Sequence, residues 1–245
     1  MENRRILNKL LQTQNFNEPH KHLCDADDYA RAIAGVENVV AVVSDLVNGT
    51  SLIYDGGFGD TIGLKDYIRE DSIWETRILS MMSDAEQEEK CIAELRFFHY
   101  LRHLPKARRK NYYLIARLRF NLADGGFIDI LHRMYYVFDD KMENVVGAIC
   151  LYGPLTFDFK GKSHAVNSLS GVAEPLTSST NSAVLSKRER QILTLIDSGL
   201  KSAEIAEYLN ISKHTVSRHR QEILARLQVK NSIEACRLAR SMELI

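Results

Sequence analysis

A predicted helix over residues 212–227 carries side chains that could recognise nucleic-acid bases. At 100° per residue, the apolar face of this helix holds Val216, Ile223 and Leu227. The opposite face holds His214, Arg218 and Gln221. An arginine can bind guanine O6 and N7 with two hydrogen bonds, and a glutamine can bind adenine N6 and N7 in the same way. This pattern predicts base recognition in a DNA groove.

The start of the same helix suits phosphate groups. Lys213 supplies a positive charge, and Ser212 supplies a hydroxyl at the expected N-cap. The first-turn N–H groups of a helix have no partner within the helix, so they also attract anions. Arg220 lies toward the apolar side, and we expect its guanidinium to extend outward to a phosphate.

Short helices on either side must position these side chains. Ser186 and Glu189 have the spacing of a capping box, and Gly199 is expected to end that first helix in a left-handed conformation. Ser202 is expected to cap a second helix, which carries Ile205, Ala206 and Leu209, and residues 231–234 repeat the capping-box spacing for a fourth, which carries Ile233, Ala235, Leu238 and Ala239. Residues 185–245 hold 4 Lys and 7 Arg against 1 Asp and 6 Glu, a net charge of +4, whereas the whole chain is neutral. A basic four-helix tail on an acidic body is typical of a DNA-binding module joined to a second domain.

The C-terminal segment resembles the LuxR-type family of bacterial regulators. The family pattern stands here as Leu185-Ser186-Lys187-Arg188-Glu189, then as Ser202-Ala203-Glu204-Ile205-Ala206, and then as Ile211-Ser212-Lys213-His214-Thr215-Val216. The resemblance and the helix pattern together give these expected DNA-binding residues: Ser202, Ser212, Lys213, His214, Thr215, Ser217, Arg218, Arg220, Gln221 and Lys230. Many members carry Lys or Arg where this chain has Ser217, so the DNA sequence that it reads stays open.

The resemblance implies a sequence-specific DNA-binding transcription regulator with the 212–227 helix in the major groove. Its implied partners are double-stranded DNA, a second copy of the chain, and RNA polymerase. Helix-turn-helix proteins commonly bind paired half-sites as dimers. We expect the dimer to form through the fourth helix, the sheet of the first domain, or both.

Residues before the basic tail show a mixed pattern. Residues 39–45 and 51–54 flank an Asn-Gly turn and predict a hairpin, and a helix begins at Ser83. Two alternating segments over residues 112–122 and 127–138, followed after a polar turn by residues 145–151, predict an antiparallel meander. This order of elements over residues 25–156 resembles a PAS-type sensor domain, a five-stranded sheet with helices over one face.

One histidine of the meander could contact a ligand. His132 shares a strand face with apolar residues, so it is either a core histidine bonded to a backbone carbonyl or a contact in a sensor pocket. Leu118, Ile130 and Met134 would line such a pocket. The alternative is a protein-docking domain that binds no small ligand. No specific cofactor is indicated, and any ligand is an unidentified small molecule.

Other residues that could do chemistry form no recognisable catalytic or metal site. His99 and His103 stand four residues apart without a third ligand, and we expect both at the surface. Cys24, Cys91, Cys150 and Cys236 are far apart in the sequence, so reduced, packed thiols are expected. We therefore expect no enzymatic activity.

The fold class predicted from these patterns is α+β, with an N-terminal PAS-like antiparallel sheet with helices and an all-α four-helix C-terminal domain. The expected domains are residues 1–159 and 184–245. Residues 160–183, which are rich in Ser, Thr, Asn and Gly, are expected to form a linker. No segment has the roughly 20 apolar residues needed to cross a bilayer. We therefore expect no membrane partner and a cytoplasmic protein.

Overall fold

A computed structural model describes residues 2–12, 14, 21–158, 160–177, 185–227, 229–242 and 244–245. The N-terminal elements are α1 (Glu2–Gln12), α2 (Lys21–Glu37), β1 (Val40–Asp45), β2 (Thr50–Asp55), α3 (Phe58–Ile62), β3 (Arg69–Glu70), α4 (Thr76–Ser80), α5 (Asp84–His103), α6 (Lys106–Arg109), β4 (Tyr112–Asn121), β5 (Phe127–Phe138), β6 (Val145–Pro154), β7 (Ser163–Asn167) and β8 (Ala173–Pro175). The C-terminal elements are α7 (Lys187–Asp197), α8 (Ser202–Tyr208), α9 (Lys213–Leu227) and α10 (Ser232–Ser241).

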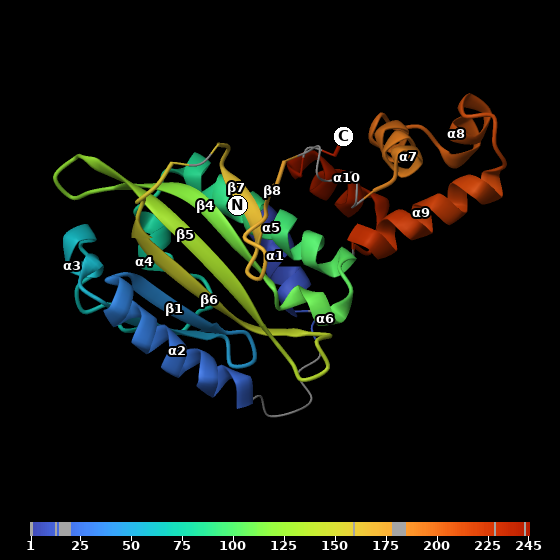
Figure 1. The fold of residues 1–245 in the computed structure, drawn as a ribbon. Helices are drawn as coiled ribbons and strands as arrows, with labels where there is room; N and C mark the ends of the chain where they lie inside the picture. Colours follow the sequence, from blue (N-terminus) through green and yellow to red (C-terminus); the bar gives the residue numbers. More distant parts are fainter. Residues whose placement is uncertain are drawn as a thin grey trace.

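The strands form one antiparallel sheet in the order β3-β2-β1-β6-β5-β4-β7-β8 (Figure 1). β1 and β2 pair as the expected hairpin, with Val42 opposite Ile53. β4, β5 and β6 pair in succession as the expected meander. The five strands predicted from the sequence are therefore central and adjacent, in the order β2-β1-β6-β5-β4, and the PAS-like α+β fold is confirmed.

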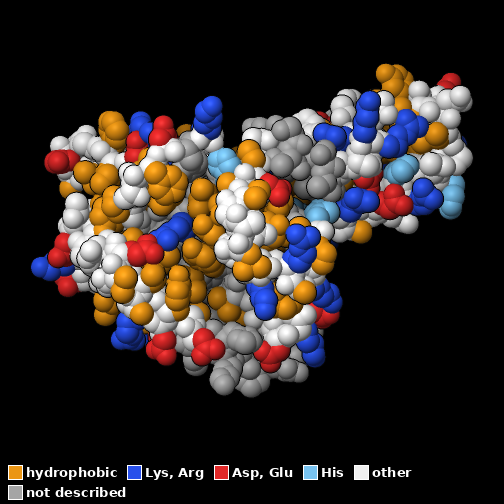
Figure 2. Space-filling view, in the orientation of Figure 1, with side chains coloured by type: hydrophobic (Ala, Val, Ile, Leu, Met, Phe, Trp, Pro, Cys, Tyr) orange, Lys and Arg blue, Asp and Glu red, His pale blue; other side chains and the backbone are white. Residues whose placement is uncertain are grey.

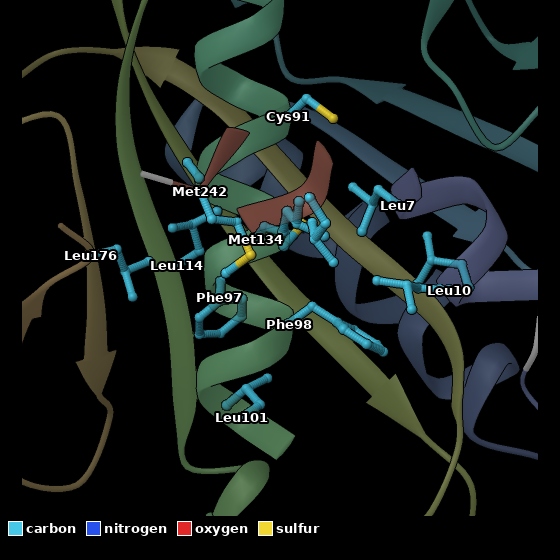
Figure 3. Packing of buried hydrophobic residues seen from close by; sticks show 14 of the residues in the cluster. Leu7, Leu10, Cys91, Phe97, Phe98, Leu101, Leu114, Met134, Leu176 and Met242 are labelled. Atoms are coloured by element: carbon cyan, nitrogen blue, oxygen red, sulfur yellow. The ribbon is translucent and has the colours of Figure 1, made fainter. Parts of the chain in front are cut away.

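Helices cover the two faces of this sheet unequally. On one face, α1 packs beside α5, and their apolar side chains meet those of β4 and β5, as the labelled Leu7, Phe97, Leu114 and Met134 show (Figure 3). On the other face, α2 packs its alanines against β1 and β6, where Leu151 is buried. Successive residues of a strand point to opposite faces, so alternate residues of β1 belong to the two separate cores.

The prediction of a linker over residues 160–183 is wrong for residues 160–175, which include two strands. Within it, β7 pairs with β4, so that Ala165 lies opposite Leu114, and β8 pairs with β7. The sheet therefore continues at least to Pro175 and does not end at residue 159. Strands of five and three residues have a weak sequence signal, because their stability comes from a neighbouring strand rather than from their own propensity. The remaining linker residues, 178–183, lie outside the described residues.

The C-terminal helices begin and end largely where their capping signals stand. Ser186 and Glu189 form the expected capping box of α7, and Gly199 follows that helix with a φ of 88°. Asn231 caps α10 by accepting a hydrogen bond from the Glu234 N–H at 3.0 Å. Ile233 departs from the prediction, since its side chain is 67% exposed and does not join the core.

The two domains touch through the first and last helices of the chain. Lys9 on α1 donates to both carboxylate oxygens of Glu234 on α10, each at 2.9 Å. Arg96 on α5 donates to the carbonyl oxygens of Leu176 and Met242, each at 3.2 Å. α1 therefore bridges the sheet domain and the helical domain. Among the helices of the described residues, none is long and apolar enough to cross a membrane.

Candidate functional site

α8 and α9 form a helix-turn-helix. After α8, Asn210 adopts a left-handed conformation with a φ of 52°, and the Ile211 N–H donates to the Ala206 carbonyl at 2.9 Å. Ser212 then begins α9 as expected, because its hydroxyl accepts a hydrogen bond from the Thr215 N–H at 3.0 Å. This turn sets α9 at an angle to α8 on the side of the molecule away from the sheet (Figure 1).

The faces of α9 separate as the sequence predicts. Val216, Ile223 and Leu227 are buried against the other three helices. Ser217, Arg218 and Gln221 are exposed. A helix anchored by its apolar face thus presents hydrogen-bonding side chains to the outside. Figure 2 shows Lys, Arg and His side chains gathered over this part of the C-terminal domain.

Most of the other expected DNA-binding residues lie near this exposed face. Ser212, Lys213 and His214 are exposed around the start of α9, and Thr215 is half-buried there. Lys230 is exposed ahead of α10. The segment from Ser212 to Gln221 thus carries the predicted base-contacting side chains together with Ser212 and Lys213, whereas Lys230 follows the opposite end of α9.

Two expected DNA-binding residues have a different place in the structure. Ser202 does not cap α8, which has Lys201 at its N-cap position. Instead, the Arg220 guanidinium donates to the Ser202 hydroxyl at 2.8 Å and to the Ser232 hydroxyl at 2.9 Å. Arg220 therefore ties α9 to the starts of α8 and α10, and we assign it to domain packing. The expected phosphate contact of Arg220 stays a prediction, and a helical wheel alone did not show that the Ser202 and Ser232 hydroxyl groups surround this side chain.

Glu222 is a neighbour of the exposed face that the sequence argument missed. Its carboxylate lies 3.4 Å from Arg218 Nε and 3.1 Å from His219 Nδ1. The i,i+4 spacing of Arg218 and Glu222 was the available signal. Both side chains are largely exposed, so this pair is weak and Arg218 can leave it at little cost.

The four candidate ligand residues of the sheet are all buried in the N-terminal core: Leu118, Ile130, His132 and Met134. Met134 lines a cavity of about 30 Å³, room for roughly one water molecule. Leu118 and Ile130 face each other across β4 and β5. The four side chains are thus part of the buried core, and their contact with a ligand stays a prediction.

His132 meets neither of the two expectations in full. Its ring stacks on Tyr152 with 4.7 Å between centroids. Among the described residues, neither ring nitrogen has a hydrogen-bond partner, so the expected bond to a backbone carbonyl is absent. Burial lowers the pKa of His132 well below its usual value, and the ring is neutral at physiological pH.

Beside these residues lies a buried ionic cluster that the sequence argument missed. Lys90 on α5 lies 2.5 Å from Glu94 and 3.7 Å from Glu75, and all three side chains are almost fully buried. Burial by itself would lower the pKa of Lys90, but the two carboxylates outweigh it and raise that pKa. The i,i+4 spacing of Lys90 and Glu94 next to the apolar residues Cys91 and Leu95 was the signal. Only the tertiary structure adds Glu75.

The remaining expectations concern histidines and thiols. His99 is fully buried, contrary to the expected surface position, and His103 Nδ1 lies 2.7 Å from the His99 carbonyl oxygen. Cys91, Cys150 and Cys236 are buried and free, as expected. The Cys24 side chain lies outside the described part of the chain.

Comparisons with known proteins agree on the C-terminal domain. Residues 183–239 match the family model for GerE, bacterial regulatory proteins of the luxR family. The response regulator UvrY of Escherichia coli K12 is 38% identical over 66 residues, which are 27% of this chain and 30% of that protein. The fimbriae Z protein of the same strain is 41% identical over 69 residues, 28% of this chain and 33% of that protein. The chain thus spans about a third of the length of these relatives.

Solved structures resemble more of the chain at lower identity. The similarity to a phage VqmA–DPO complex extends over 88% of this chain and 88% of the VqmA chain, at 16% identity and a TM-score of 0.33. A LOV protein of Rhodobacter sphaeroides covers 90% of this chain and 97% of that protein, at 15% identity and a TM-score of 0.36. Likenesses of this size carry no conclusion about ligands or assembly. The family match rests instead on residues 183–239 and on the geometry of α7 to α10. The C-terminal domain of this chain is therefore a helix-turn-helix domain of the luxR family of bacterial regulatory proteins.

Proposed function

We propose that this chain is a sequence-specific DNA-binding transcription regulator that inserts α9 into the major groove. The exposure of Ser217, Arg218 and Gln221 on a helix anchored by Val216 and Ile223 is the observation that carries the proposal. The major groove, about 12 Å wide, admits an α-helix. In helix-turn-helix proteins the N-terminal residues of the second helix contact base edges.

The contacts divide into base reading and positioning. Arg218 and Gln221 are proposed to bind base edges, with Ser217 beside them. Lys213, Ser212 and Lys230 are proposed to bind phosphates, which fix the orientation of the helix without reading sequence. His214 and Thr215 stand between the two groups at the start of α9.

The N-terminal domain is proposed to be a PAS-like sensor that controls this DNA binding. The contact of α1 with α10 supports the idea, because it joins the sheet domain to the DNA-binding domain. We place the domain boundary between Leu176, which still packs in the N-terminal core, and Leu185. We further propose that the chain acts in the cytoplasm as a homodimer on paired half-sites.

The proposal is tested by selecting random-sequence duplexes with the purified full chain at physiological salt. We expect enrichment of a two-fold-symmetric site. Arg218→Ala should weaken binding to that site by about 1–3 kcal/mol and relax the preference at one base pair in each half-site. Arg69→Ala, an exposed arginine of the sheet domain, is the matched control and should select the same site as the native chain.

Equal losses on selected and random duplexes for Arg218→Ala would contradict its base-reading role. Failure of the native chain to enrich any sequence would contradict the proposed function as a whole.

A further inference from the structure

A cavity of about 380 Å³ opens on the N-terminal domain between α1, α4 and α5. Its volume falls within the range of small-molecule sites, about 300–1,000 Å³. Trp74, Leu79 and Cys91 give it apolar walls. These walls suit an organic molecule better than a hydrated metal ion, which needs oxygen ligands on several sides.

The polar walls of this cavity are mainly acidic. Asp84, Glu88 and Glu94 line it, against the two cations Arg4 and Lys90. Lys90 is already neutralised, since Glu94 lies 2.5 Å and Glu75 lies 3.7 Å from its ammonium group. Among the described residues of the lining, Asp84 and Glu88 then stand beside the cation Arg4.

The Arg4 side chain provides an example of a cation bound at this cavity. Its guanidinium carbon lies 4.9 Å from the centroid of the Trp74 ring, which is the geometry of a cation–π contact. The adjacent Asn3 donates a hydrogen bond to the Glu88 carboxylate. The first turn of α1 thus supplies the aromatic face with a cation from the chain itself.

We propose that this cavity binds a compact organic cation, which displaces the Arg4 guanidinium from the Trp74 ring and pairs with Glu88 and Asp84. The inference deepens the proposed sensor role and rests on it for its biological meaning. The bound molecule would act directly on α1, whose far end holds Glu234 of α10 through Lys9. The ligand site and the DNA-binding domain are therefore joined through one 11-residue helix.

The test uses three probes of one shape: benzamidine, which is cationic, benzamide, which is neutral, and benzoate, which is anionic. Trp74 is the single tryptophan of the chain, so its fluorescence reports on the cavity without a label. We expect benzamidine to change the Trp74 emission of the full chain saturably. Benzamide and benzoate should leave the emission unchanged over the same concentration range.

Three variants of the full chain sharpen this test. Arg4→Ala removes the internal competitor and should tighten benzamidine binding about two- to fivefold. Glu88→Gln removes a carboxylate partner and should weaken it about two- to fivefold. Glu89→Gln is the matched control, because Glu89 on the same helix pairs with Lys162 and does not line the cavity. Its benzamidine affinity should equal that of the native chain.

A response to all three probes alike, or no response to benzamidine, would overturn the proposal. So would a benzamidine affinity that is the same in the native chain, Arg4→Ala and Glu88→Gln, because the probe would then bind elsewhere. Far-UV circular dichroism of each variant shows whether it is folded, and the opposite signs expected for Arg4→Ala and Glu88→Gln are not produced by a general loss of structure. The fluorescence readout needs no DNA, so failure of the cavity and failure of DNA binding are distinguishable.

Discussion

His99 on α5 and His132 on β5 are two fully buried histidines at the centre of the N-terminal domain. Burial lowers the pKa of both, that of His99 to about 3, with the nearby His103 and Arg102 adding to the effect. In the unfolded chain each histidine has a pKa of about 6.5. Around and below that pH the unfolded state therefore binds more protons than the folded state. The free energy of unfolding decreases as the pH is lowered.

At this residue scale we predict that acidification from pH 7.5 to 5.5 lowers the free energy of unfolding by about 1.4 kcal/mol through His99, and that His132 adds a loss of the same sign. Urea titrations followed by Trp74 fluorescence measure this quantity at each pH. His132→Phe, which can still stack on Tyr152, should reduce the pH dependence by the share of one histidine. His214→Asn changes an exposed histidine of α9 and should leave the pH dependence intact. An unchanged pH dependence in His132→Phe would contradict the buried neutral state of His132.

At the scale of the element, α9 depends on two kinds of basic side chain. Arg220 points inward and joins α9 to Ser202 and Ser232 at the starts of two other helices. Lys213 is exposed at the first turn of α9. Arg220 thus holds α9 within the domain, whereas Lys213 has no such packing role. Substitutions at the two positions should therefore have different consequences.

We predict that Arg220→Ala lowers the stability of the C-terminal domain by about 1.5–3 kcal/mol, as loss of charged hydrogen bonds does. Thermal or urea unfolding measures this loss. The salt dependence of DNA binding should stay the same, because no phosphate contact is removed. Lys213→Ala should do the reverse, leaving stability unchanged and reducing the slope of log K against log salt by about 1. A reduced slope of log K against log salt in Arg220→Ala would show that Arg220 contacts a phosphate of the DNA.

At the scale of the whole molecule, the two domains meet where α1 lies against α10. Lys9 and Glu234 form the ion pair of this contact, and Arg96 adds hydrogen bonds to Leu176 and Met242. The pair is partly exposed, with 43% of the Lys9 side chain accessible. Its strength is accordingly that of a surface ion pair, about 0.2–1 kcal/mol. The ion pair is therefore a weak part of the contact, which also includes Met242 packed in the same apolar cluster as Leu114 and Leu176.

We predict a coupling energy of about 0.2–1 kcal/mol between Lys9 and Glu234 in a double-mutant cycle of Lys9→Ala and Glu234→Ala. Unfolding of the full chain is the measurement. The coupling should shrink at high salt, because exposed charges are screened. The same cycle with Arg31→Ala, an exposed arginine on α2 that lies 3.7 Å from Asp27, should give no coupling to Glu234→Ala. Additive effects for Lys9 and Glu234 at low salt would show that this pair does not join the domains.

The sequence by itself determined the elements whose signals are local. Capping residues such as Ser186, Ser212 and Asn231 predicted where helices begin, and Gly199 predicted where one ends. Alternation predicted β4 and β5, because both strands are long and have one more apolar face, whereas β6 is a nearly continuous apolar run that is buried on both faces. The exposed face of α9 also followed from periodicity alone. Such features depend on residues within a few positions of one another, so one sequence suffices to find them.

Only the tertiary structure decided features that join distant parts of the chain. β7 is a strand because β4, about fifty residues earlier, offers it backbone hydrogen bonds. Arg220 was expected to contact a DNA phosphate, and in the structure its guanidinium donates hydrogen bonds to the Ser202 and Ser232 hydroxyl groups. The Glu75–Lys90 pair and the Arg4–Trp74 contact likewise bring together side chains from separate elements. No local pattern encodes these contacts, because a side chain's partner is fixed by how helices and sheet pack and not by the residues beside it in sequence.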